Sequence, residues 1–389
     1  MTDADRRLQE TIRLLADLVA FESLPRRANL AIAGYVRDYL AGHGITAHLL
    51  PGPEGDRFNL FASIGPGYQP GYVLSGHMDV VPVGGQDWSS DPFRLVETEG
   101  RLQARGAVDM KGFLACVLAM VPVFKAEKLT RPVHLAFSYD EEVGCCGVPH
   151  LLTELPRLCA PPLACIVGEP TELRPVLAHK GKQAMEIVFT GRSSHSSTPD
   201  RGENAIYPAA ELLLFIRALN ARLEREGPFD PRFDPPSSTV VAGIVQGGSA
   251  VNIIPDRCTL AFEVRSVPGA APQEVSALVL AHLKTLLAQA AAEGRPLRAS
   301  HREIARYPAL APSEDRDLVG LLEALSGRES QASVSYGTEG GLFQAAGIPT
   351  IVCGPGSISR AHRPDEYILP GELADCLAML KRLAGAMSR

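Results

Sequence analysis

The chain has 389 residues, of which 46% are hydrophobic and 21% are charged, and its formal net charge is −6. This composition excludes a largely disordered or fibrous protein. No basic stripe indicates nucleic acid or an anionic membrane surface as a partner, and no apolar run approaches the roughly 18 residues of a membrane span. The first ten residues are charged and lack the apolar core of a signal peptide, so we expect a cytoplasmic protein.

The first part of the chain alternates between two kinds of hydrophobic pattern. Apolar residues recur at helical spacing in some segments, whereas others are short apolar runs bounded by Gly and Pro. This alternation predicts an α/β sheet with helices on both faces. Helices are predicted over 8–20, 31–40 and 112–124, and strands over 59–64, 72–75, 133–139 and 163–168.

The pattern changes after Gly181 and returns to the first style near Tyr307. The intervening β-α-β-β-α order is typical of a separate α+β layer. We therefore expect a first domain of 1–181 plus 300–389, interrupted by a second domain of 182–299. Strands are predicted over 183–190, 238–246, 257–265 and 350–353, and helices over 204–224, 272–292, 314–325 and 370–387.

Side chains that bind metals gather at the ends of the predicted strands, within glycine-rich sequence. Open α/β sheets place their sites at such strand ends. Imidazole and carboxylate together form the ligand set of zinc, manganese or cobalt. The residues concerned are His77, Asp79, Asp109, Glu141, Glu142, Glu169 and His362.

Each of these residues also has a structural interpretation when taken alone. Asp109 could cap the following helix, and Glu141 with Glu142 could form an exposed acidic pair. His77 differs from a structural histidine because Asp79 lies two residues later on the same strand face and could hold its other ring nitrogen, as partners of metal-binding histidines do. Their combination favours a metal site. The histidines at 43, 48, 134 and 150 are interpreted as structural.

Three motifs resemble the M20 metallopeptidase family. They are Gly76-His-Met-Asp-Val-Val-Pro82, Arg105-Gly-Ala-Val-Asp-Met-Lys-Gly112 and Asp140-Glu-Glu142, with Trp88-Ser-Ser-Asp-Pro-Phe93 between the first two. The resemblance covers nearly the whole chain, with the motifs in order and at typical spacing. Further motifs around His195, Glu339 and His362 look most like the acetylornithine deacetylase branch of the family.

The resemblance implies a catalytic α/β domain whose mixed sheet is flanked by helices. A smaller α+β, ferredoxin-like domain would interrupt it and serve as lid and dimerisation domain. The resemblance also implies a cis peptide bond at Asp109–Met110 and a homodimer. Two divalent metal ions are expected, with zinc first and cobalt or manganese as alternatives.

The resemblance also assigns roles to the metal-binding residues. Asp109 would bridge the two metals. His77 and Glu169 would complete one metal site, and Glu142 and His362 would complete the other. Asp79 would orient His77, and Glu141 would be the general base and acid that activates a metal-bridged water.

The implied reaction is hydrolysis of the N-acyl amide of an amino acid. Within the branch, the substrate would be N2-acetyl-L-ornithine and the products L-ornithine and acetate, in arginine biosynthesis. Other activities of the family are alternatives: an N-acyl-amino-acid deacylase, a succinyl-diaminopimelate desuccinylase or a dipeptidase. Two alternatives of other kinds are a non-catalytic relative that binds a metal or ligand, and a thiol amidase that uses Cys145 or Cys146. The eight cysteines are otherwise interpreted as reduced structural thiols.

Four further residues are candidates for contact with the substrate. His195 would stabilise the oxyanion, in its own subunit or its partner's, although it could be a surface loop histidine. Asn252 could hydrogen-bond near the scissile carbonyl, and Arg265 could hold the substrate carboxylate. A turn asparagine and a strand-surface arginine are their structural alternatives. Glu339 would place a carboxylate near the ammonium of an ornithine side chain.

Overall fold

The computed structural model describes residues 2–313 and 315–388, and its contacts divide the chain into two compact units. The first unit covers the chain up to Ala178, then Leu310–Ser333, and then the chain from Thr338 onward. The second unit covers His179–Ala309 and Val334–Gly337. The predicted interruption of 182–299 falls inside this second unit, which also contains the strand that follows it.

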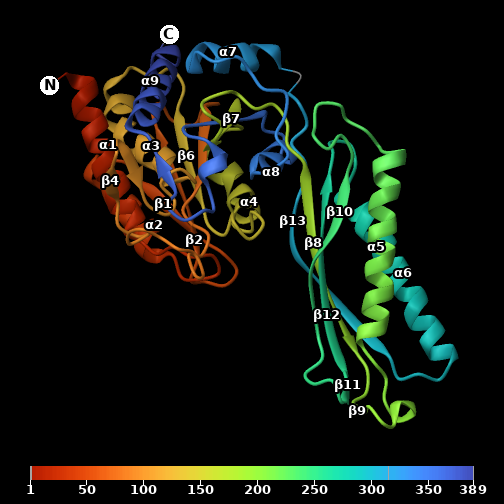
Figure 1. Ribbon diagram of the computed structural model, residues 1–389. Coiled ribbons are helices and arrows are strands. Elements are labelled where there is room, and N and C mark those ends of the chain that lie inside the picture. The colour runs from red at the N-terminus through yellow and green to blue at the C-terminus, as the bar shows by residue number, and fades with distance from the viewer. Residues whose placement is uncertain (1, 314, 389) are drawn as a thin grey trace. The chain divides into compact units, whose positions relative to one another are not determined.

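The first unit is built on a six-stranded mixed sheet (Figure 1). Its strand order is β1-β2-β6-β3-β7-β14. The four strands from β6 to β14 run parallel, so their carboxyl ends lie at one edge, whereas β2 runs antiparallel to both of its neighbours, β1 and β6. This confirms the predicted fold class. The strands are β1 (Ala47–Pro51), β2 (Phe58–Ile64), β3 (Tyr72–His77), β6 (Val133–Ser138), β7 (Ala164–Pro170) and β14 (Thr350–Gly354).

Helices cover both faces of this sheet, so its central strands are buried on both sides. Leu74, Ile166 and Ile351 join the large core that the first set of helices forms, whereas the alternate residues of the same strands point to the other face. The first set is α1 (Asp3–Val19), α2 (Leu30–Gly42), α3 (Lys111–Ala126), α7 (Arg316–Ser326) and α9 (Pro370–Ala386); the second is α4 (Val148–Leu158) and α8 (Gly340–Ala345).

Two further details complete the first unit. A small sheet in the order β15-β5-β4 pairs Tyr367–Ile368 (β15) with Arg101–Gln103 (β5), beside Val96–Thr98 (β4). It brings together two segments that are far apart in the sequence. The helix predicted from Glu314 begins at Arg316, and Glu314 itself lies outside the described residues.

The second unit is a four-stranded antiparallel sheet in the order β10-β12-β8-β13. Its two long helices pack on the same face of the sheet (Figure 1) and share one hydrophobic core with it. The chain order β-α-β-β-α-β with this strand order is the ferredoxin-like arrangement. The elements are β8 (Gly181–Thr190), α5 (Ile206–Glu226), β10 (Thr239–Gly247), β12 (Arg257–Ser266), α6 (Pro272–Ala292) and β13 (Arg298–Tyr307). A two-stranded ladder joins β9 (Ser194–His195) to β11 (Ile253–Ile254), and a short 3-10 turn lies at Pro199–Arg201. Another 3-10 turn, at Ile358–Arg360, belongs to the first unit.

Helix α6 is the one described helix that is long and apolar enough to cross a bilayer by length and composition. This differs from the expectation of no such run, because alanines and leucines make up most of the helix. Its buried residues recur every three or four positions, which is the spacing of a helix that covers one face of a sheet. Those in the hydrophobic core are Val275, Val279, Leu283, Leu286 and Ala290, and Pro272 and Ser276 at the start of the helix are buried as well.

Candidate metal centre

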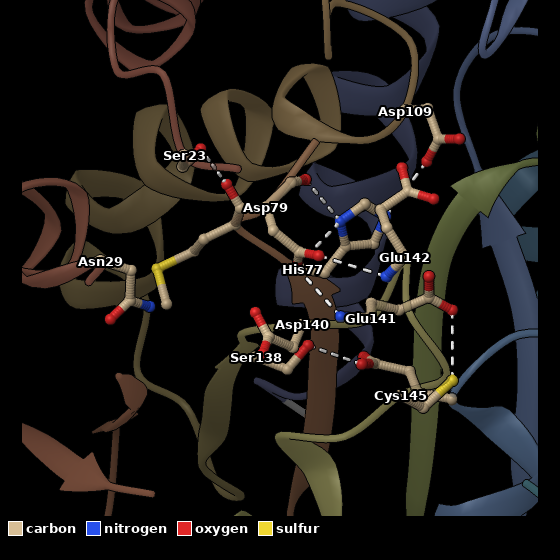
Figure 2. Close-up of polar contacts among 12 residues, drawn as sticks. Ser23, Asn29, His77, Asp79, Asp109, Ser138, Asp140, Glu141, Glu142 and Cys145 are labelled. Carbon is tan, nitrogen blue, oxygen red and sulfur yellow. Dashed lines mark hydrogen bonds and ion pairs between the residues drawn. The ribbon is translucent and has the colours of Figure 1, made fainter. Parts of the chain in front are cut away.

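The predicted metal-binding residues of the first unit come together at the carboxyl edge of the mixed sheet. Figure 2 labels His77, Asp109, Glu141 and Glu142 among them. His77 is the last residue of β3, and Glu169 lies near the end of β7. Glu141 and Glu142 follow β6, and Asp109 lies just before α3. Parallel strands place these side chains at one edge, because each strand ends there.

Asp109 stands between the two histidines of the cluster. Its Oδ1 lies 3.1 Å from His77 Nε2, and its Oδ2 lies 3.1 Å from His362 Nε2. The carboxylate is buried, and the Asp109–Met110 peptide bond is cis, as the resemblance implies. Each oxygen therefore faces a different imidazole, which is an arrangement suited to bridging two cations.

His77 is held in one orientation by its own strand end. Its Nδ1 donates to the backbone carbonyl of Asp79 at 2.9 Å. Because a carbonyl only accepts, Nδ1 carries a proton, and Nε2 is the ring nitrogen that a metal could bind. That nitrogen faces Asp109 and, at 3.6 Å, Glu169 Oε1. The contact of Nδ1 with the carbonyl of Asp79 is the kind that metal-binding histidines commonly make with the nitrogen that does not bind the metal.

The carboxylate of Asp79 makes contacts beyond the one the sequence predicts. It lies 3.7 Å from His77 Nδ1 and accepts the backbone N–H groups of Glu141 at 3.1 Å and Glu142 at 3.2 Å (Figure 2). Burial raises the pKa of Asp79 to about 7, although His77 nearby lowers it. Asp79 thus orients the histidine through its carbonyl and fixes the two glutamates through its side chain.

Glu142 supplies the observation that best tests whether a cation fits. Its Oε2 lies 3.1 Å from His362 Nε2. Its Oε1 is buried without a hydrogen-bond partner among the described residues. A buried polar atom left unpaired costs about 1–3 kcal/mol, and more when it is charged. A divalent cation among Glu142, Asp109 and His362 would satisfy this oxygen, so these residues fit a metal.

The electrostatics of the cluster lead to the same conclusion. Burial, joined by neighbouring carboxylates, raises the pKa of Glu141 to about 8 and that of Glu169 well above its usual range. Hydrogen bonds to Asp109 and Glu142 raise the pKa of His362 to about 11. The metal-free cluster therefore retains protons to offset its negative charge, and divalent cations would replace them.

Glu339 lies in a different environment from the one the sequence predicts. Its side chain is fully buried in the first unit, and both of its oxygens are occupied. It accepts hydrogen bonds from Ser75 and, at 2.7 Å, from Ser138. These serines lie on β3 and β6, just before the strand ends that carry His77 and Glu141. We therefore correct the predicted contact with a substrate ammonium, because Glu339 instead makes a buried contact with β3 and β6.

Three of the predicted substrate-binding residues belong to the second unit. His195 and Asn252 are brought together there, because β9 pairs with β11 and the N–H of Ser196 donates to the carbonyl of Asn252 at 3.0 Å. Arg265 donates to Glu263 at 2.5 Å and to the hydroxyl of Tyr307 at 2.9 Å. Its guanidinium therefore already has a carboxylate partner within this unit.

Cys145 makes a contact that sequence reasoning missed. Its thiol donates to Glu141 Oε1 at 3.3 Å. Burial and the charge of Glu141 raise the pKa of Cys145 well above its usual range, and burial also raises that of Cys146. Because the thiolate is the nucleophilic form, neither cysteine is activated for catalysis. This disfavours the thiol amidase among the alternatives.

Comparison with known proteins agrees with this geometry. Residues 73–386 match the model of the peptidase family M20/M25/M40. The chain is 35% identical over 370 residues to the acetylornithine deacetylase of Proteus mirabilis, covering 93% of this chain and 92% of that protein. It is 35% identical over 375 residues to the acetylornithine deacetylase of Myxococcus xanthus, covering 95% of each.

Solved structures share the fold. An M20 family metallo-carboxypeptidase from Sulfolobus solfataricus matches with a TM-score of 0.78 and 19% identity, covering 97% of this chain and 99% of that one. Human carnosine dipeptidase 1 matches with a TM-score of 0.77 and 17% identity, covering 99% and 98% of the two chains.

The fold, the clustered imidazoles and carboxylates and these relatives define a metal-dependent amidohydrolase. The chain belongs to the peptidase family M20/M25/M40. Membership implies divalent metal ions, for which the strand-end cluster offers the ligands.

We expect zinc binding to the metal-free protein to release protons and to tighten as pH rises from about 6 to about 8. With pKa values of about 8 for Glu141 and about 11 for His362, both groups hold protons in that range. Metal binding expels such protons, so a higher pH weakens their competition. Calorimetric titration in two buffers of different ionisation enthalpy measures the released protons.

A matched control is His134→Gln. His134 is buried elsewhere in the first unit, and burial lowers its pKa to about 4, so it is neutral in this range. The variant should show the wild-type proton release. Zinc binding with the same affinity at both pH values and no proton release would contradict the charge balance described above.

Proposed function

We propose that the protein hydrolyses N2-acetyl-L-ornithine to L-ornithine and acetate. The relatives named acetylornithine deacetylase support this reading, at 33–37% identity over most of the chain. The observation that carries the chemistry is the carboxylate of Asp109 between two histidines, next to the unpaired oxygen of Glu142. A reaction of this kind belongs to arginine biosynthesis.

Two divalent cations would be held by the cluster. His77, Asp109 and Glu169 would hold one, and Asp109, Glu142 and His362 would hold the other. We propose zinc, with cobalt or manganese as alternatives, because carboxylates with two imidazoles suit all three metals. When bound, the cations supply a water whose pKa is lowered towards neutrality and a Lewis acid for the acyl carbonyl.

Glu141 would carry the proton. It is left outside both proposed ligand sets, and its backbone is fixed by the carboxylate of Asp79. Its carboxylate contacts the Cys145 thiol through one oxygen, which restricts its rotation. We propose that it accepts the proton of the attacking water and delivers it to the leaving amine.

The second unit would contribute to substrate binding. We propose that His195 hydrogen-bonds the developing oxyanion, that Asn252 bonds near the scissile carbonyl, and that Arg265 binds the substrate carboxylate. The pairing of β9 with β11, which places His195 beside Ile253, supports a joint role for His195 and Asn252. The contacts of Arg265 with Glu263 and Tyr307 would keep its guanidinium in place.

The first test is hydrolysis of N2-acetylornithine beside N-acetylmethionine and succinyl-diaminopimelate. We expect acetylornithine to be cleaved with a kcat/KM higher by orders of magnitude. Chelation should abolish cleavage, and zinc or cobalt should restore it. The Glu141→Gln variant should keep both metals and lose about 10²–10⁴-fold in kcat, the usual contribution of a positioned base.

Two results would count against this proposal. Preference for another acyl-amino acid with the same metal dependence would replace the substrate and keep the chemistry. Cleavage that survives chelation, or full activity of Glu141→Gln, would reject the chemistry itself.

The buried position of Glu339 yields a prediction about specificity. We expect Glu339→Gln to lower kcat/KM for N2-acetylornithine and for neutral N-acetylmethionine by a similar factor. The reason is that Glu339 acts through Ser75 and Ser138 rather than on the substrate. Steady-state kinetics on both substrates measure this, with exposed Glu329→Gln as the charge-matched control. A KM increase confined to the cationic substrate would restore the direct contact.

We propose that the protein is a cytoplasmic homodimer that associates through the second unit. Strand β10 is an edge strand of its sheet, and Val241, Ile244 and Val245 on it are exposed. Unpaired apolar edges tend to associate. Sedimentation should show a dimer that Val245→Lys dissociates and that Val251→Lys, in an exposed turn, leaves intact. A wild-type monomer would overturn this proposal.

The eight free thiols support the proposed cytoplasmic location, because they suit a reducing compartment.

A further inference from the structure

A buried ion pair lies directly behind the metal-binding residues of the first unit. Arg105 and Glu366 are almost completely inaccessible to solvent, and Arg105 Nη1 donates to Glu366 Oε2 at 2.6 Å. The guanidinium also lies over the ring of Trp88, 5.0 Å from its centroid. Its Nε has no hydrogen-bond partner among the described residues. Burying two charges is costly and often adds no net stability, so this pair calls for another explanation.

The other oxygen of Glu366 holds the backbone of Asp109. Glu366 Oε1 accepts the N–H groups of Val108 at 3.0 Å and of Asp109 at 3.1 Å. Its carboxylate is therefore shared between a guanidinium and two peptide groups. Because Arg105 fixes one oxygen, the position of the other is fixed as well. The peptide that carries the shared carboxylate of the metal centre is positioned by this contact.

Gln86 connects the same guanidinium to His362. Gln86 Oε1 accepts from Arg105 Nη2 at 2.6 Å and from Trp88 Nε1 at 3.1 Å. With its oxygen so engaged, the amide nitrogen of Gln86 points the other way and donates to the backbone carbonyl of His362 at 3.1 Å. His362 needs such support because it lies in a loop, with φ of 60° and a half-exposed side chain.

We propose that Arg105, Glu366 and Gln86 form a positioning clamp that sets the metal affinity of the centre. The clamp reaches the backbone of His362, a proposed ligand of one cation only, and that of Asp109, the proposed ligand of both. It makes no described contact with His77 or Glu169, which are held by the ends of β3 and β7. The clamp thus acts unequally on the two metal positions, and the inference rests on the proposed metal arrangement.

The test uses the full-length protein, stripped of metal and titrated with zinc against a chromophoric chelator. We expect Gln86→Leu to weaken the binding of one zinc by about 10–100-fold, the usual effect of losing a partner that orients a ligand. The other zinc should keep its wild-type affinity. With cobalt in place of zinc, the visible absorption of one of the two bound ions should change and that of the other should not.

Two further variants separate positioning from simple stabilisation. Gln86→Glu keeps the acceptor for Arg105 and loses the donor to His362, so it should weaken the same zinc. Gln344→Leu is the matched control, because Gln344 also bridges backbone groups, those of Ala311, at 2.8 Å in the first unit. It should leave both zinc affinities unchanged. Thermal melting of each metal-free variant reports any loss of fold.

Three results would overturn the inference. Unchanged affinity for both zinc ions in Gln86→Leu would reject the clamp and leave the proposed metal arrangement standing. Equal weakening of both ions, together with a lower melting temperature of the metal-free variant, would mean that Gln86 only stabilises the fold. A wild-type protein that binds fewer than two zinc ions would reject the proposed metal arrangement and the clamp with it.

Discussion

The structure of the first unit depends on one buried carboxylate that faces two imidazoles. Asp109 is in contact with His77 through one oxygen and with His362 through the other. Burying a carboxylate among other carboxylates is unfavourable unless positive charge is present. The histidines provide part of that charge by holding protons, and divalent cations would provide all of it. The surrounding contacts keep this cluster of like charges in place.

Those contacts come from the segment that follows β3 and from two loops. Backbone and side chain of Asp79 act on different residues, His77 and the two glutamates after β6. Glu366 and Gln86 hold the loops that have no strand to support them. Such an arrangement keeps the side chains in place before any ligand arrives, and preorganisation of this kind is the main source of electrostatic catalysis.

The sequence predicts the elements of the sheet and the members of the cluster because both leave local signals. Buried parallel strands are continuous apolar runs, and their ends carry the polar residues. The sequence does not predict strand β13, since Arg298–Tyr307 is mostly exposed, carries four charged residues among its ten and shows no apolar alternation. Helix α4 carries Pro156 within it and was missed as well.

The contacts that sequence reasoning missed are those between residues distant along the chain. The carboxylate of Asp79 looked like a partner of the nearby His77, but it is taken by the peptide groups of Glu141 and Glu142. Glu339 looked like a substrate contact because its motif resembles a binding loop, but two serines from other strands enclose it. Neither pairing has a spacing or a periodicity that could reveal it.

The most direct test of the shared carboxylate is anomalous diffraction at the zinc edge, on crystals grown with zinc. The proposed arrangement predicts two peaks about 3.5–4 Å apart, the usual separation in two-metal sites, with one oxygen of Asp109 bound to each. A single peak, or two peaks of which Asp109 binds only one, would contradict the account.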